Sequence, residues 1–455
     1  MIRTRLAPPN TPSPQAPTTA DYRHTTHSSL RAGSRVAAAI LLLCAGVACA
    51  TGVDSPVPDS PGQLLPDGGV LLSDGGVLLS DGAVVSGPGQ GDAGGDGGGS
   101  DSGDGGGTGN FPYAVSNVDP GDYTYAGDPS IDCGPVTFDT DALTPSEWCG
   151  VAIAPVVAMQ VDGPEVVVVP LAGLTVEDMN TLKFTGSRPV VLLVDGDVVI
   201  DGMLDVSADA TVPGPGGDDP LEDSHDCALG TGEVGETDRG GNNGAGGGGG
   251  GGFGQPGAAG SAGRAGGDGG AGGAAEGTDS LSPLRAGCAG GRGGNGWTSV
   301  DDLRWGGAGG GAIQISAAGD LTVGATGVID AGGGGGSTST GGEDGGGGGG
   351  SGGGILLQAV TLAVTGAVVA NGGGGAEGMD TDSGNGSATP GQDGRPDDIA
   401  ALGGSSAPTE LGGHGGNGGL PSGAAPTAGM TNYSNNGDGG GGGGGGAGRV
   451  VLIEG

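Results

Sequence analysis

The sequence predicts an all-β protein: a short parallel β-helix of about four to five coils, with long glycine-rich insertions and a small N-terminal cap. Three observations support this prediction. Short apolar runs recur in a degenerate repeat between residues 165 and 455, glycine supplies 119 of the 455 residues, and aromatic residues gather just before the repeat. The apolar runs provide a modest core, and the glycine-rich stretches are excursions from it.

Residues 1–50 are predicted to be a signal peptide. The apolar run VAAAILLLCAGVA at 36–48 follows two arginines and is too short to span a bilayer. Either Ala48-Cys49-Ala50 is an ordinary cleavage site, or Cys49 is the lipidated cysteine of a bacterial lipoprotein. The tether that follows favours the lipoprotein, anchored to the cell envelope at the outer membrane or cell surface. The alternative is a secreted protein.

Residues 51–110 form a low-complexity Gly/Asp/Ser tether. The unit DGGVLLS occurs at 67–73 and 74–80 and decays into DGAVVS. Its repeated aspartates repel one another, which favours an extended, flexible stalk. Residues 111–164 contain six aromatic residues and two cysteines, and are predicted to form the N-terminal cap.

Four cysteines remain in the exported part, namely Cys133, Cys149, Cys227 and Cys288. An even number in an oxidising compartment indicates disulfides, for which four cysteines allow three pairings. Proximity favours Cys133–Cys149 and Cys227–Cys288. There is no CxxC pair and little histidine, so no metal site is predicted.

The repeat defines the domain at 165–455. Full copies begin at residues 165, 189, 312 and 355, and a half copy ends the chain at 449–455. Each full copy holds three apolar runs with the period-two alternation of strands, which is what one coil of a parallel β-helix requires. Equivalent positions should then form interior columns, one through Leu174, Val198, Leu321 and Leu362, and a second through Val176, Ile200, Val323 and Val364. The alternative is a β-sandwich of the same strands.

Insertions separate the copies at 210–311, 334–354 and 374–448. All follow a third strand, so they should leave the coils at one corner. Glycine occupies every third position from Gly254 to Ala274, and GGHGGNGG at 412–419 keeps this period. Period three suits packed helices of the polyglycine type, which need glycine wherever they touch. The alternative is unordered loops, because ordering glycine is entropically costly. Deleting 336–350 should leave the coils folded, because long surface insertions add little to stability.

Charge and motifs exclude several functions. The net charge of −38 argues against nucleic-acid binding. A GxGxxG at Gly252, Gly254 and Gly257 carries no information within a glycine run, so nucleotide binding is not predicted. His225 and His414 lie in polar loops, and no catalytic residue is assigned. No cofactor is predicted beyond weak calcium binding, for which the candidate acid pairs are Asp218/Asp219, Glu222/Asp223, Asp301/Asp302 and Asp397/Asp398.

Residues 165–455 also resemble known proteins. GSRPVVLLVDGDVVIDGMLDVSA, GGGAIQISAAGDLTVGATGVIDAGGGGG and GGGILLQAVTLAVTGAVVANGGGG are similar to glycine-rich secreted proteins and lipoproteins of myxobacteria. The repeats resemble the β-helical coils of filamentous-haemagglutinin-type adhesins. The resemblance implies a surface location and a β-helix, and it transfers no catalytic residue.

We therefore expect a non-enzymatic structural or adhesive protein that displays glycine-rich loops, with glycans or matrix as partners. A polysaccharide-active β-helix enzyme, a lyase or hydrolase, is the first alternative. It would need clustered carboxylates on one face, and the strands offer few, namely Asp197, Asp201, Asp205, Asp320 and Asp330, at turn positions. An ice- or crystal-binding protein is the second alternative, suggested by the period-three glycine.

Overall fold

The computed structural model describes residues 110–455, except 223–226, 239–243, 265, 297–303, 340–341, 381–387, 407–411 and 432–437, and three short strands before residue 110. Its regular structure is β, apart from a 3-10 turn, η1, at Pro120–Asp122. Among the described residues, no helix has the length and apolar character needed to cross a membrane. The predicted signal peptide, including Cys49, lies outside the described residues.

Strands from successive copies pair in parallel, as stacked copies require, and no antiparallel pairing between copies occurs in the described residues. The third and fourth copies run their first two strands together as β15 (Ala312–Val323) and β17 (Gly354–Val364). First strands pair with first strands, second with second, and third with third. The remaining strands of this parallel stack are β9 (Glu165–Leu171), β10 (Leu174–Val176), β11 (Thr181–Thr185), β12 (Val190–Val194), β13 (Val198–Ile200), β14 (Met203–Asp205), β16 (Val328–Asp330), β18 (Ala367–Val369) and β19 (Arg449–Glu454).

The register within the stack confirms both predicted columns. Leu174 pairs with Val198, Val198 with Leu321, and Leu321 with Leu362. The second column runs in the same way from Val176 to Val364. Side chains of the inner layers are buried in one apolar core, whereas the last member, Val364, is 39 % exposed. Alternation of apolar and polar residues fixes this register, because a slip by one would turn every core side chain outward.

Residues 128–159 lie on the first copy. Strands β4 (Ser130–Ile131) and β5 (Val136–Asp139) add to β10 and β11 in parallel, whereas β8 (Val156–Met159) is antiparallel to β9. Between them, β6 (Glu147–Trp148) and β7 (Val151–Ala152) form a hairpin. Phe138, Trp148 and Phe184 meet edge to face with ring centroids 5.8–6.0 Å apart. This aromatic cluster closes the core at its first layer.

The start of the predicted cap covers the outer face of the first-strand sheet. Strands β9 and β12 are apolar on both faces, as is typical of parallel strands that are buried on both sides. Their outward side chains, such as Val168 and Leu193, belong to a second apolar cluster that Phe111 and Tyr125 help to cover. The Tyr113 hydroxyl lies 2.7 and 2.8 Å from two backbone carbonyl oxygens of β15 and β17. Residues 111–125 therefore act as a cover along the side of the stack.

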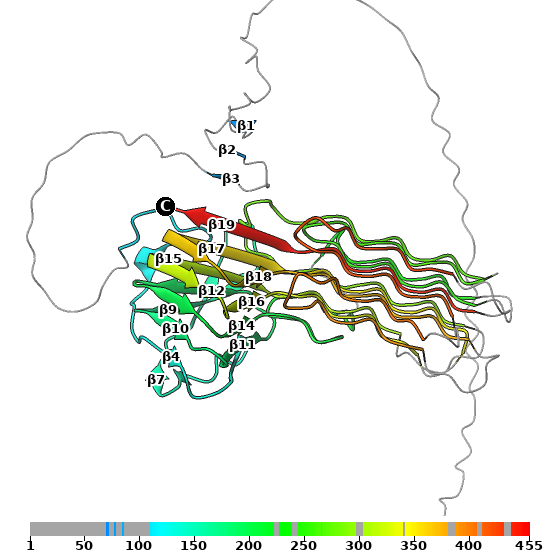
Figure 1. Cartoon of the computed structure of the whole chain (residues 1–455), viewed down its shortest axis with the longest axis horizontal. Helices are drawn as coiled ribbons and strands as arrows, with labels where there is room; N and C mark the ends of the chain where they lie inside the picture. The colour runs from blue at the N-terminus through cyan, green and yellow to red at the C-terminus, as the bar shows by residue number, and fades with distance from the viewer. Residues whose placement is uncertain are drawn as a thin grey trace, which may run out of the picture. The chain divides into compact units, whose positions relative to one another are not determined.

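The three insertions leave the stack at one corner, as predicted. They follow β14, β16 and β18, which are neighbours in one sheet. Each outgoing segment also bonds to a returning one, since Gly311, Gly353 and Gly448 donate to the carbonyls of Val206, Ala331 and Ala370. From this corner the described glycine-rich segments extend side by side in one direction (Figure 1).

Replacing Val323 with Asp tests the columns. Val323 is fully buried between Ile200 and Val364, so the variant would place an unpaired charge in the core. We expect a loss of unfolding free energy on the order of 4 kcal/mol or more, measured by denaturant unfolding. Thr322→Asp, on the outward side of the same strand, is the matched control and should cost far less. Equal effects of the two substitutions would contradict the assigned interior.

Candidate functional site

The insertions form one ordered assembly, which we call the glycine bundle; it comprises the described residues of 229–311, 331–353 and 370–448. Its segments carry no internal strand or helix, yet most of their glycines are buried. The alternative of unordered loops is therefore wrong for the described residues. Three glycine runs lie at its centre, 244–253, 343–353 and 438–448, and each comes from a different insertion. The bundle is thus a joint product of all three insertions.

Backbone hydrogen bonds join each central run to its neighbours with a period of three residues. In the first run, Gly246, Gly249 and Gly252 donate to segment 230–236, while Gly247 and Gly250 donate to segment 258–261. The remaining amides, 245, 248 and 251, donate to the second central run. A helix with three residues per turn and no internal hydrogen bonds presents its amides in three directions in this way. The hydrogen bonds therefore support the packed-helix alternative for period-three glycine.

Glycine is required because neighbouring backbones lie so close together that no side chain fits between them. A Cβ added to Gly249 would lie 1.9 Å from the carbonyl oxygen of Ala271, and one on Gly348 would lie 2.0 Å from that of Gly249. The central runs are touched on every side, so nearly every position is glycine. In segment 256–263 only one side faces the first central run, and there a Cβ on Gly257 or Gly260 would clash. Glycine is thus required at the positions whose Cβ would point at a neighbouring backbone, and the alanines between them are tolerated although this segment also bonds to the third central run and to segment 267–275.

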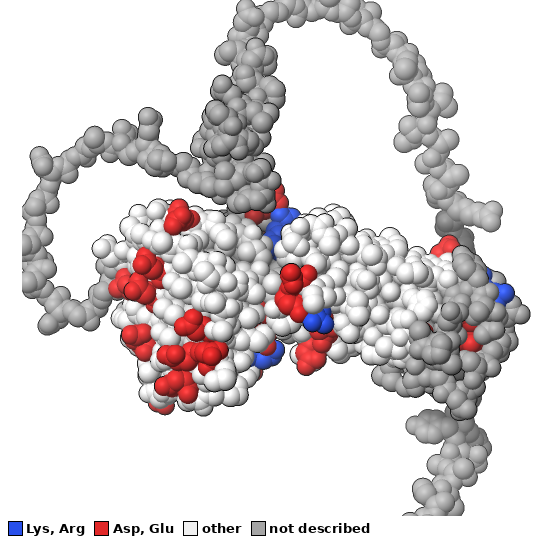
Figure 2. Space-filling view, in the orientation of Figure 1, with Lys and Arg blue, Asp and Glu red and all other residues white. Residues whose placement is uncertain are grey.

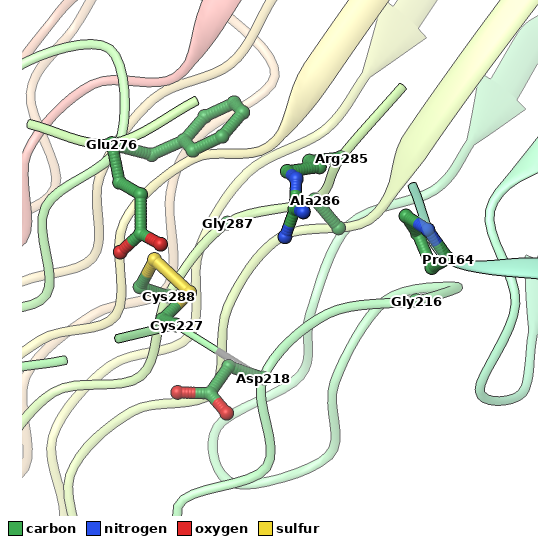
Figure 3. A pocket seen from close by; sticks show the side chains of 10 residues that line it. Pro164, Gly216, Asp218, Cys227, Glu276, Arg285, Ala286, Gly287 and Cys288 are labelled. Atoms are coloured by element: carbon green, nitrogen blue, oxygen red, sulfur yellow. A yellow bond between two sulfur atoms is a disulfide. The ribbon is translucent and has the colours of Figure 1, made fainter. Parts of the chain in front are cut away.

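The Cys227–Cys288 disulfide ties the first insertion together near the stack, and the Cys133–Cys149 disulfide lies in the cap. Both match the pairing favoured by proximity. Figure 3 shows the Glu276 carboxylate beside the Cys227–Cys288 bridge, where it accepts the backbone N–H groups of residues 228–230. Asp218, on the other side, accepts from Thr231 Oγ1 and the Ala289 N–H. Two carboxylates and a disulfide therefore hold this loop by satisfying backbone amides.

These groups account for the described metal candidates. Cys227, Glu276 and Cys288 have ligand atoms within 4.8 Å of one another, but both cysteines are oxidised and supply no thiolate. Of the acid pairs considered for calcium, Asp218 is engaged as above and Asp397 binds Arg395 at 2.7 Å. Asp301/Asp302 and Asp223 lie outside the described residues.

A carboxylate pair occupies the corner where the insertions leave. Asp205 and Asp330 are adjacent in register on β14 and β16, and both are buried. Lys183 on β11 donates to Asp205 at 2.6 Å, and the Gly332 N–H donates to Asp330 at 2.9 Å. Burial, with a smaller contribution from the neighbouring Asp205 carboxylate, raises the pKa of Asp330 to about 7. Two acids in unlike environments are the feature that an enzyme would need, but only 2 % of Asp330 is exposed.

The other predicted positions lie apart from this pair. Asp197 and Asp201 lie between strands, whereas Asp320 lies within β15 at its irregularity, which corrects its predicted turn position. Asp197 accepts the Asp320 N–H at 2.9 Å. His414 lies within the bundle, and His225 lies outside the described residues. Sequence reasoning missed Arg304, which is fully buried in the bundle 3.7 Å from Asp344. In the sequence, Arg304 and Asp344 each lie close to a glycine tract, and this is the signal by which they could have been found.

Charge is unevenly distributed over the molecule. Figure 2 shows acidic side chains gathered over the parallel stack, whereas the middle of the bundle is largely uncharged on the face in view. Among the described residues of the bundle, Trp305 is a partly buried aromatic side chain, and the Arg292 guanidinium lies 5.0 Å from the centre of its ring. Comparisons with known proteins give no match to a family model, a curated protein or a solved structure.

Gly348→Ala tests the requirement for glycine in the bundle. The new methyl group would meet the backbone of Gly249 and cannot be accommodated without separating two central runs. We expect amide exchange in 244–253 and 438–448 to accelerate at least tenfold, measured by hydrogen–deuterium exchange, while the stack stays protected. Ala259→Ser adds one atom at an exposed position and should leave exchange unchanged. Unaltered protection in Gly348→Ala would contradict the packing described above.

Asp330→Asn tests the carboxylate pair through pH. Because its pKa is raised in the folded state, Asp330 keeps a proton that the unfolded chain releases between pH 3.8 and about 7. The free energy of unfolding that this group contributes therefore falls by about 1.4 kcal/mol per pH unit as pH rises through that window. Above the window the contribution is constant. The amide cannot titrate, so the variant should gain on the wild type from pH 4 to 7, measured by denaturant unfolding. Asp320→Asn, at an exposed position of β15, is the control. Parallel profiles for wild type and Asp330→Asn would contradict the assignment.

Proposed function

We propose that this chain is a non-enzymatic cell-surface protein in which a short parallel β-helix of four to five coils carries the glycine bundle and displays it for adhesion or matrix contact. The observation that carries the proposal is the joint bundle, because three long insertions leave one corner and bond to one another. An assembly of this kind is an extended, ordered projection. A loop needed only as a connection would not be this long or this ordered.

The β-helix reading rests on the order of the strands. Each copy contributes three strands in turn to three neighbouring positions, and the next copy lies directly on it in parallel. Stacked coils of this kind bury an apolar interior that no single coil can bury. The inner columns of Val, Leu and Ile form that interior. The stack thus serves as a rigid base for the bundle.

The proposed location follows from the cysteines. Two disulfides indicate an oxidising, extracytoplasmic compartment. We propose that Cys49 carries a lipid that anchors the chain to the cell envelope, with residues 51–110 as the tether. The anchor would then hold the bundle at the cell surface, and glycans or matrix are the proposed partners.

Trp305 is the side chain of the bundle best suited to such contact. It is partly accessible to solvent, and Arg292 stacks on its ring. Aromatic and arginine side chains are enriched where partners bind, since they combine apolar area with a polar group. An aromatic ring beside a cation suits the apolar face of a sugar that also bears an acidic group. A glycan is therefore the partner that this pair favours.

The test is binding of the mature protein to a glycan array and to matrix-coated surfaces. Trp305→Ala should weaken binding about tenfold, which is typical of a buried aromatic contact. Tyr123→Ala changes a half-buried aromatic side chain of the cap and should leave binding intact. Binding that depends on Tyr123 and is indifferent to Trp305 would contradict display by the bundle. Release of reducing sugars from a bound polysaccharide, abolished by Asp205→Asn, would favour the enzyme.

One observation favours the ice- or crystal-binding alternative. Segments 256–263 and 267–275 are bonded side by side and expose alanines at three-residue intervals, Ala259 on the first, and Ala271 and Ala274 on the second. A regular face of small residues suits a repeating solid surface better than a flexible chain. Inhibition of ice recrystallisation that is lost in Ala271→Glu and kept in Trp305→Ala would favour this function over glycan contact.

A further inference from the structure

The last layer of the parallel stack leaves core positions uncovered. Strand β19 pairs only with residues 354–359 of β17, and in the described residues no strand pairs with the outer edge of 361–364 or of β18. Val360 and Val364 are 36 % and 39 % exposed, and Leu362 and Val368 are only partly buried. One layer inward, Leu321, Val323 and Ile329 are fully buried. They are the register partners of Leu362, Val364 and Val368. This open end is an unpaired sheet edge with apolar side chains, which favours docking of a further β-segment.

The tether contains a segment with the pattern of a coil. Residues 70–72, 77–79 and 83–85 are apolar, each run following Gly or Asp-Gly, and equivalent positions are seven residues apart. In the stack the second and third strands are six residues apart from Val198 to Leu204, and eight from Leu321 to Ile329. The sequence GAVV occurs both at 82–85 and at 366–369, where it supplies β18. The tether segment therefore matches the layer that it would cover.

This segment forms β-structure that is too small to be stable alone. Strands β1 (Val70–Leu71), β2 (Val77–Leu78) and β3 (Val84–Val85) pair antiparallel with two residues each. So short a sheet needs a further apolar surface to be stable in water. The tether segment thus offers apolar side chains, and the open end of the stack offers, among the described residues, an apolar edge to receive them.

The connection allows the two to meet within one chain. Asn110 is fixed to the stack by a hydrogen bond from its N–H to Asp195. Residues 86–109 link it to β3, and a chain of about 24 residues reaches up to about 80 Å when extended. That span exceeds the few layers of about 4.8 Å between Asp195 and the last coil. The linkage also gives the segment a millimolar effective concentration at its own stack.

We propose that residues 67–85 dock on the open end of their own stack and cover Val360, Leu362, Val364 and Val368. The occupant is this segment rather than a second copy, because it offers matching apolar runs at a higher local concentration. Docking shortens the free tether to the residues before 67. It also protects the edge from pairing between copies. This inference is independent of the proposed adhesive function.

The test is hydrogen–deuterium exchange of the full mature chain. We compare the wild type with the triple variant Leu71→Asp, Leu78→Asp and Val85→Asp. The control places the same three charges elsewhere in the tether, as Ala93→Asp, Ser100→Asp and Ser102→Asp. Amides of 361–369 should exchange at least tenfold faster in the first variant than in the wild type or control, with 244–253 unchanged in all three. Equal exchange at 361–369 in all three proteins would overturn the proposal.

A reciprocal change and the oligomeric state complete the test. Val364→Asp should expose the tether to a protease that cuts before Leu and Val, speeding cleavage at 70–79 at least fivefold. Thr322→Asp, on the outer face of an inner layer, should not. Protection of 361–369 that rises with protein concentration, together with a dimer in sedimentation, would show that a second copy is the occupant and would overturn docking within the chain.

Discussion

Close approach of bare backbones is the constraint on which the structure depends. In the glycine bundle, carbonyl oxygens lie about 2 Å from where a Cβ would stand, so a side chain and the lateral hydrogen bond exclude each other. Each hydrogen bond contributes about 1 kcal/mol net, and ordering a glycine costs more backbone entropy than ordering any other residue. Only a large and fully bonded array can offset that cost. The three central runs supply such an array because every one of their sides is used.

The parallel stack solves the problem of bringing these runs together. The runs are about 100 residues apart in sequence, and closing loops of that length is entropically costly. The columns of Val, Leu and Ile fix three departure points and three return points within one sheet corner. Hydrophobic burial in the stack therefore positions segments that contribute few apolar side chains of their own, chiefly Phe253, Leu281 and Leu284. Conversely, the bundle holds the corner closed from outside, where Asp205 and Asp330 lie between the two.

The periodicity of apolar side chains predicted the strands and their stacking. The packing of the glycine runs could not be predicted in the same way, because glycine has no side chain to form a pattern. Alternation at Leu321 and Val323 defined strands, copies and columns, because side chains there have an inside and an outside. The disulfide pairs followed from proximity. Yet residues 246–252 are all glycine, so the sequence does not indicate which neighbouring segment each of them contacts. The sequence could therefore suggest period-three helices at Gly254–Ala274 but not decide between order and disorder, nor place Arg304 against Asp344. The sequence also did not predict that residues 111–125 cover the side of the stack, because their aromatic residues are equally compatible with a cap over its end.

The scarcity of apolar side chains in the bundle has a thermal consequence. Hydration of apolar surface gives unfolding its large heat capacity and weakens hydrophobic stabilisation on cooling. The stack follows this behaviour, because its core is aliphatic. The bundle buries chiefly peptide groups, whose exposure lowers the heat capacity instead. Its contribution to stability therefore has little of the curvature that leads to cold denaturation, and the projection stays ordered at temperatures where the aliphatic core is losing strength.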